Sequence, residues 1–215
     1  MNNCNAYLLN ATDGNIYKQE NDGGLISLTL ESGEAAAVYL TERRLSTTDV
    51  ISTDKSTVLS DFKMRRVNSF RFGHMTAINE AIHEQESPIT LGCWADVVGG
   101  DFSGTCSYRA SFSGVDSDAI LDLGDVRHVS EVFLNGEPLG VKIMKPYRFR
   151  IKKELLRDEN ELEILVTNTV ANQQHYSKTF DKWKLWQLTS YSLKQNEYDC
   201  DSLDSGLYGP VRILY

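Results

Sequence analysis

The chain has 215 residues, of which 41% are hydrophobic and 24% charged, and its formal net charge is -8. This is the composition of an ordinary globular chain, and the length suits one or two domains. The acidic excess is present in both halves and leaves no basic face, which argues against nucleic acid and anionic lipid surfaces as partners.

No apolar run approaches the roughly 18 residues that a membrane span requires, so no membrane contact is expected. The first ten residues, MNNCNAYLLN, have neither a basic leader nor a long apolar stretch, and they predict no secretory signal. Cys4, Cys93, Cys106 and Cys200 show no CxxC spacing and no clustered histidine. They are predicted to be buried thiols rather than zinc ligands or a disulfide framework, so no metal or other cofactor is expected.

Strand signals dominate the first part of the chain. Short apolar runs alternate with turn clusters at intervals of about ten residues, which is typical of all-β proteins. Asp13-Gly14 favours a tight hairpin turn because both residues tolerate positive φ angles. A polar stretch at residues 41–61 predicts a long loop or linker. The strands predicted before it are Ala6–Leu9, Ile16-Tyr17, Leu25–Leu30 and Ala35–Leu40.

Strand-like alternation resumes at Phe62. The stretch Met75–Glu86 is the one helix that the sequence predicts, because Ile78 and Ile82 lie four residues apart, although a pair of strands also fits. Gly99-Gly100 marks the predicted boundary between domains. The two predicted domains are an accessory β-sandwich in residues 1–100, which the chain start leaves open to being incomplete, and a second sandwich in residues 101–215.

The second half has a clearer strand pattern. Leu121 and Leu123 alternate with polar neighbours, and Asn135-Gly136 is a strong hairpin signal. A short helical turn at Glu154–Leu156 precedes a strand with an alternating apolar face. The strands predicted in this half are Ser107–Phe112, Ala119–Leu123, Val129–Leu134, Tyr147–Ile151, Glu161–Asn168 and Val211–Tyr215. The fold class is therefore all-β, with two sandwiches.

Four sequence blocks follow one another in the order of a known layout. They are FSGTCSYRASF (102–112), AILDLGDVRHVSEVFLNGEPLG (119–140), KPYRFRIKKELLRDENELEILVTNTVAN (145–172) and SGLYGPVRI (205–213). This half resembles the galactose-binding-like, jelly-roll sugar-binding module of family 2 glycoside hydrolases. It is most similar to the module of the α-L-rhamnosidase-like enzymes of family 106. Residues 1–100 resemble the β-domain that precedes it.

The resemblance implies a non-catalytic region of a glycoside hydrolase. Its partners would be the catalytic domain of the same enzyme, which it supports, and carbohydrate. No catalytic activity is expected from this chain alone, because a (β/α)₈ barrel needs about 250 residues of alternating strands and helices. Two alternatives are a free-standing carbohydrate-binding module and a glycosidase active by itself. A soluble protein in the periplasm, or secreted as part of a larger enzyme, is compatible with this resemblance.

The segment from Asn172 to Ser205 is the first candidate for carbohydrate contact, because connections of this length are usually functional or disordered. It contains Trp183, Trp186 and Tyr176. Aromatic rings stack on the C–H faces of sugars, while polar neighbours bind the hydroxyl groups. The two tryptophans, three residues apart, could equally pack a short helix onto the sandwich.

Asn135 is the second candidate for sugar contact, and its alternative role is that of a turn residue with positive φ. Glycoside hydrolysis needs two carboxyl groups across the scissile bond, one with a raised pKa. Asp199, Asp201 and Asp204 lie close together in a polar stretch that predicts ordinary ionised carboxylates. A calcium site built from them is the lesser alternative.

Overall fold

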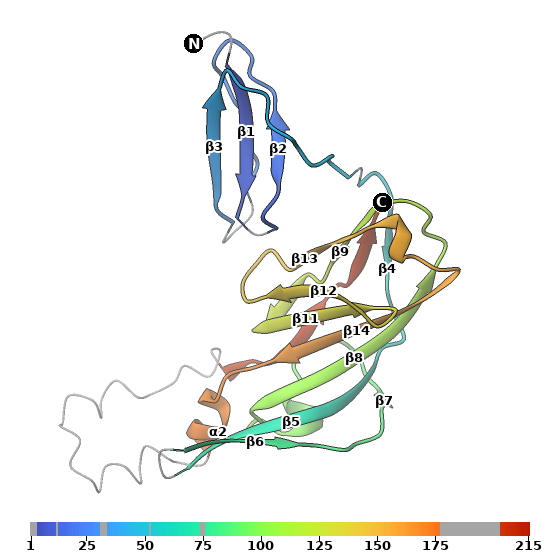
Figure 1. The fold of residues 1–215 in the computed structure, drawn as a ribbon. Helices are drawn as coiled ribbons and strands as arrows, with labels where there is room; N and C mark the ends of the chain where they lie inside the picture. Colours follow the sequence, from blue (N-terminus) through green and yellow to red (C-terminus); the bar gives the residue numbers. More distant parts are fainter. Residues whose placement is uncertain (1–3, 12, 31–33, 52, 74–75, 177–202) are drawn as a thin grey trace, which may run out of the picture.

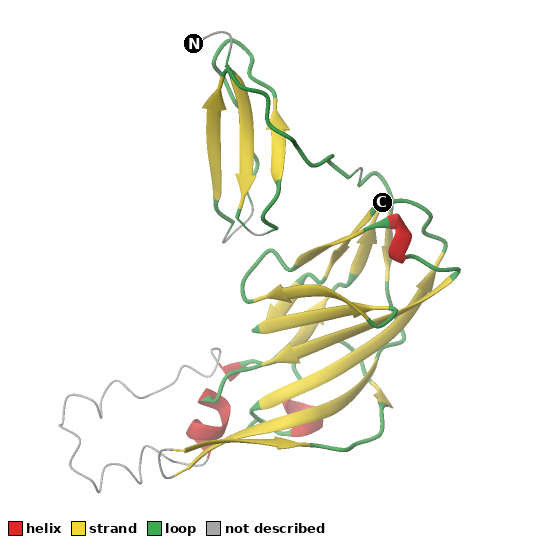
Figure 2. Cartoon of the chain, viewed as in Figure 1, coloured by secondary structure: helices red, strands yellow, loops and turns green. Residues whose placement is uncertain are grey.

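The computed structural model describes the chain except for residues 1–3, 12, 31–33, 52, 74–75 and 177–202. The described residues consist mainly of antiparallel strands, joined by turns and a few short helical segments (Figures 1 and 2). This confirms the all-β prediction.

A three-stranded sheet forms the N-terminal unit and stands apart from the remaining strands in Figure 1. Its order is β2-β1-β3, with the hairpin turn at Gly14, where φ is 72°. The strands are β1 (Asn5–Asn10), β2 (Ile16–Gln19) and β3 (Ala36–Thr41). The strand predicted at Leu25–Leu30 is wrong: an isolated bridge joins Asp22 to Leu25, and the following residues have no strand assignment.

Two larger sheets form a curled sandwich of the jelly-roll type. The large sheet has the order β12-β11-β14-β8-β5-β6, with β7 beside β5, and the small sheet has the order β13-β9-β16-β4. The large sheet comprises β5 (Lys63–Gly73), β6 (Thr76–Ala81), β7 (Ser87–Pro88), β8 (Gly104–Ser113), β11 (Val129–Leu134), β12 (Glu137–Lys142) and β14 (Glu159–Thr167). The small sheet comprises β4 (Ser56–Val58), β9 (Ala119–Asp122), β13 (Arg148–Ile151) and β16 (Arg212–Leu214).

A two-stranded ribbon and short helical segments complete the unit. The ribbon pairs β10 (Asp125–Arg127) with β15 (Gly206–Gly209). The helical segments are α1 (Ala95–Val98), η1 (Lys153–Leu155) and α2 (Ala171–Tyr176). The segment η1 agrees with the helical turn predicted near Glu154, whereas α1 was not predicted.

The core lies between the two sheets because each strand turns alternate side chains inward. Leu162, Ile164 and Val166 of β14 are at most 1% exposed, and Leu121 and Ile213 of the small sheet are fully buried. Burial of such side chains contributes roughly 1.5–3 kcal/mol each. The alternation predicted from the sequence is therefore the alternation that builds the core.

Two predictions about residues 56–100 need correction. The helix predicted at Met75–Glu86 is wrong, because Thr76–Ala81 forms strand β6 and hydrogen-bonds to β5. The strand pair offered as its alternative is closer to the structure. The predicted boundary at residue 100 falls inside a hydrogen-bonded sheet, since β5 pairs directly with β8 across it.

The cysteines differ in their surroundings. Cys106 is buried, as predicted, whereas Cys4 and Cys93 are half-buried, and all three are free thiols. Burial raises the pKa of the Cys106 thiol far above its ordinary value, so this group stays protonated. Cys200 lies outside the described residues.

The substitution Leu121→Asp tests the sandwich. It places an unpaired charge in the core, which should lower the free energy of unfolding by about 3–5 kcal/mol. Val58→Asp is the matched control, because Val58 lies in the same sheet and is 60% exposed. Urea unfolding followed by circular dichroism would measure both variants, and equal stabilities would contradict the observed strand register.

Candidate functional site

Buried polar side chains gather at the end of the sandwich where β14 leaves the sheet and α2 begins. Ser103, Asn168, Asn172 and Ser205 are each no more than 6% exposed, and we call this cluster the polar end. Buried polar groups are costly unless they are hydrogen-bonded. The partners of these four residues therefore determine what the cluster holds in place.

Asn168 joins three chain segments. Its Oδ1 accepts from the backbone N–H of Gly104 at 2.8 Å, and its Nδ2 donates to the carbonyl of Phe102 at 2.9 Å. The same Nδ2 donates to Ser205 Oγ at 3.0 Å. One amide thus fixes the beginning of β8 to the end of β14 and to the chain entering β15.

Asn172, the second residue of α2, connects the helix to the chain beyond the undescribed segment. Its Nδ2 donates to the carbonyls of Leu203 at 2.6 Å and Gly100 at 3.2 Å. Its Oδ1 is buried and accepts no hydrogen bond from the described residues. Asn172 and Asn168 therefore hold residues 203–205 beside α2 at the polar end.

Glycine permits the close backbone approach beneath this cluster. A Cβ atom on Gly206 would lie 2.4 Å from the carbonyl oxygen of Gly92, and the φ of Gly206 is 132°. Trp94 is 1% exposed and meets the Phe102 ring edge-on, with centroids 5.6 Å apart. The polar end is thus supported by a tightly packed, rigid floor.

Asn168→Ala should destabilise the sandwich by about 2–3 kcal/mol, because it removes the partners of buried backbone groups at Gly104 and Phe102. Asn79→Ala provides a control, since Asn79 lies exposed on β6 of the same sheet. Chemical denaturation would compare the two variants. A loss no larger than that of Asn79→Ala would show that the polar end contributes little to stability.

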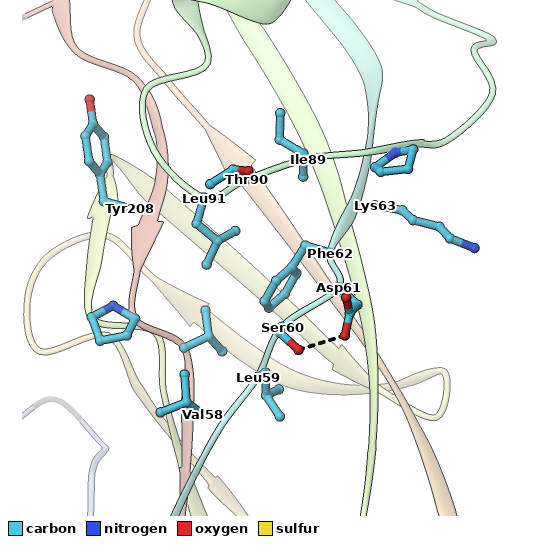
Figure 3. Close-up of a pocket in the computed structure, with 13 residues that line it drawn as sticks. Val58, Leu59, Ser60, Asp61, Phe62, Lys63, Ile89, Thr90, Leu91 and Tyr208 are labelled. Atoms are coloured by element: carbon cyan, nitrogen blue, oxygen red, sulfur yellow. Dashed lines mark hydrogen bonds between the residues drawn. The ribbon is translucent and has the colours of Figure 1, made fainter.

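An apolar pocket of about 790 Å³ lies on another part of the sandwich, between the β4–β5 connection and residues 88–91. Figure 3 shows Phe62, Leu91 and Leu59 lining its interior, with Ser60 and Asp61 at one side. Ser60 Oγ donates to the Asp61 carboxylate at 2.7 Å. Two of its polar side chains thus bond to each other, and most of the other lining residues are apolar.

The structure places only part of the predicted sugar-contact set. Trp183 and Trp186 lie outside the described residues, as do Asp199 and Asp201. Tyr176 is the last residue of α2, next to the polar end in sequence. Asp204 is half-buried, immediately before Ser205.

Asn135 is distant in sequence from the polar end, and its side chain has a structural role. Its φ is 54°, and the next residue, Gly136, also has positive φ, as a tight hairpin requires. Its Nδ2 donates to the carbonyl of Leu155 at 2.8 Å and to Asn160 Oδ1 at 3.0 Å. Its Oδ1 accepts from the N–H of Glu161 at 2.9 Å. These bonds occupy the amide within the fold.

Among the described residues, the carboxyl groups with shifted pKa values have them lowered. Hydrogen bonds from Arg66 lower the pKa of Glu84, and the N–H of Lys153 lowers that of Asp118. Partial burial acts to raise the pKa of Asp125, but the side chains of Arg127 and Lys145 outweigh it and leave that pKa lowered. None of these three carboxyl groups has the raised pKa of a general acid.

Asp125 gives a pH-dependent contribution to stability. Because its pKa is lower in the folded chain than the ordinary 3.8, its ion pairs stabilise the fold above that value. The contribution is lost as the pH falls through the folded-state pKa. Asp125→Asn should therefore reduce the melting temperature at about pH 7 but hardly at about pH 2. Asp116→Asn, at a side chain that is 91% exposed, is the control for the same two scans.

The described residues contain neither a metal-ligand cluster nor a membrane-spanning helix. No group of three or more His, Cys, Asp or Glu side chains in this part of the chain could hold a metal ion. Among the helices that the structure describes, none is long and apolar enough to cross a membrane.

This chain is similar to parts of several glycoside hydrolases. No protein family profile matches the chain. A curated relative, a putative beta-glucuronidase of Formosa agariphila, is 30% identical over 149 residues, which are 52% of this chain and 12% of the relative. A rhamnosidase structure from Novosphingobium sp. PP1Y matches 99% of this chain with a TM-score of 0.61 and 19% identity. A beta-D-mannosidase structure from Dictyoglomus thermophilum covers 74% of this chain, with 15% identity and a TM-score of 0.47.

The resemblance found in the sequence is confirmed, because this chain is similar to part of a putative beta-glucuronidase in sequence and to part of a rhamnosidase in fold. The described fold is similar to part of the Novosphingobium rhamnosidase over nearly the whole chain. The chain spans 12% of the curated relative, 20% of that rhamnosidase and 22% of the mannosidase. Most of the length of each relative therefore lies outside the part that this chain resembles.

Proposed function

We propose that this chain is a non-catalytic β-sandwich region of a glycoside hydrolase, which supports the catalytic domain and contacts carbohydrate through its polar end. The observation that carries the proposal is the similarity to one fifth of a rhamnosidase chain. A region of this size and all-β architecture lacks the alternating strands and helices of a barrel. The chemistry of hydrolysis is therefore assigned to a neighbouring domain.

Several features of the polar end support contact with carbohydrate there. Asn168 and Asn172 hold residues 203–205 beside α2 on a rigid floor, and residues 177–202 contain Trp183 and Trp186. Binding sites on loops are effective when a rigid scaffold positions them.

The alternatives differ in what the isolated chain does. A free-standing carbohydrate-binding module would bind common sugars without a catalytic domain, and a self-sufficient glycosidase would hydrolyse aryl-rhamnosides or aryl-galactosides. We expect no turnover by the isolated chain and turnover by the longer enzyme. Turnover by the chain alone would contradict the proposal.

Trp183→Ala combined with Trp186→Ala tests the carbohydrate contact. In the longer enzyme, the double variant should raise KM for an aryl-glycoside substrate about tenfold, because each stacked ring contributes roughly 0.5–1.5 kcal/mol. Tyr39→Ala is the control, an aromatic side chain that is 48% exposed on the N-terminal sheet. Unchanged KM with reduced stability would assign the two tryptophans to packing instead.

A further inference from the structure

A groove of about 950 Å³ crosses the outer face of the large sheet. Strands β8, β14 and β11 lie next to one another in this sheet (Figure 1). The groove is also lined by residues 57–61, which run from β4 toward β5, and by Gly136 in the β11–β12 hairpin. None of the four residues of the polar end lines it. Its volume is within the range of small-ligand sites, roughly 300–1,000 Å³.

The strand register places five outward side chains together in this groove. Arg109 of β8 lies opposite Glu163 of β14, which in turn lies opposite Phe133 of β11. Two residues further along β8, Ser111 lies opposite Glu161 of β14. The residues between them along each strand are buried in the core, so these five side chains point to the outer face. The groove therefore offers hydroxyl, carboxylate, guanidinium and phenyl groups as close neighbours.

Some of these groups are held in place and others are available to a ligand. The Arg109 guanidinium lies 3.2 Å from carboxylate oxygens of both Glu86 and Glu163. These two ion pairs restrict the guanidinium before any ligand arrives, which lowers the entropy cost of binding. Ser111 and Glu161 are exposed, and their side chains have no hydrogen bond or ion pair with other described residues. Both can therefore exchange hydrogen bonds with a ligand.

The charges of the groove indicate which kind of ligand it accepts. Four of its lining residues are acidic and two are basic: Asp61, Glu86, Glu161 and Glu163 against Lys63 and Arg109. This acidic excess repels a ligand that carries carboxylate groups. Arg109 is already paired with two of the carboxylates, and Asp61 accepts from Ser60 at 2.7 Å. The groove therefore favours a neutral ligand that binds through hydroxyl groups over a ligand that needs an ion pair.

We propose that this groove is a second carbohydrate site, which binds a neutral oligosaccharide and excludes uronic acids. The inference rests on the proposed function for its class of ligand and extends that function to a new surface. The ring of Phe133 provides a surface for the C–H face of a pyranose, while Ser111 and Glu161 hydrogen-bond its hydroxyl groups. The paired charges make this face costly to cover with another protein layer, which leaves it open to a sugar chain.

Titration calorimetry of the 215-residue chain tests the groove, with neutral oligosaccharides of galactose, xylose or glucose and with oligogalacturonate as probes. At least one neutral probe should bind, and oligogalacturonate should not. Phe133→Ala should weaken the neutral binding about tenfold, because the stacking ring is lost. Val141→Ala is the matched control, since Val141 is 55% exposed on β12 of the same sheet and does not line the groove.

Glu161→Lys provides a second variant, whose exposed side chain makes no contact that the fold needs. It removes a hydrogen-bond acceptor and reverses a charge, so the neutral probe should bind more weakly and oligogalacturonate should now bind. Melting temperatures of both variants would show that the fold is intact.

The absence of binding to every neutral probe would overturn the inference, as would equally strong binding of oligogalacturonate by the unchanged chain. Binding that is lost in Trp183→Ala with Trp186→Ala, but kept in both groove variants, would overturn it too, since the contact would then lie at the polar end. Glycosidase activity of the longer enzyme tests the proposed function separately. An inactive longer enzyme would refute that function, while calorimetry would still decide whether the groove binds sugar.

Discussion

The sandwich depends on the pairing of β8 with β14. These strands run side by side from Thr105 opposite Thr167 to Ser113 opposite Glu159, in the middle of the large sheet. A shift of one residue would turn every inward side chain of β14 to solvent, so the apolar alternation fixes the register. Asn168 follows the last pair, and it exchanges hydrogen bonds with Gly104 through its side chain and backbone. The register of the core therefore also sets the position of the polar end.

Short sequence patterns correctly predicted the turns and strands whose conformation depends on neighbouring residues in the chain. Asn135-Gly136 predicted a hairpin turn because both residues tolerate positive φ angles. The alternating apolar residues of β14 predicted which of its side chains are buried. The helix predicted at residues 75–86 failed because Ile78 and Ile82 also share a face of an extended chain, and β5 supplies the hydrogen bonds that decide between the two. The boundary at residue 100 failed for a related reason. Pairing between β5 and β8 joins segments about forty residues apart, which turn signals at glycines do not report.

The sequence predicted only part of the polar end. The length of the segment after Asn172 made its aromatic residues candidates for carbohydrate contact. Asn168 and Asn172, in contrast, have no sequence feature that distinguishes them from exposed loop asparagines. Their burial arises from tertiary packing, when the chains around Gly104 and Leu203 close over them. The available signal was their place at the end of a strongly alternating strand, within one of the four sequence blocks that carry the resemblance. Asn135 differs, because its positive φ was predicted from the turn, whereas the bonds of its side chain to Leu155, Asn160 and Glu161 come from tertiary packing.

Paired charges cover the outer face of the large sheet. On the outer face of the large sheet, Arg109 lies 3.2 Å from both Glu86 and Glu163, and Ser107 donates to Glu163 at 2.6 Å. Such exposed pairs add little stability, but they satisfy one another and leave no unmet charge for a partner to neutralise. Covering this face of the large sheet would therefore cost the hydration of its paired charges.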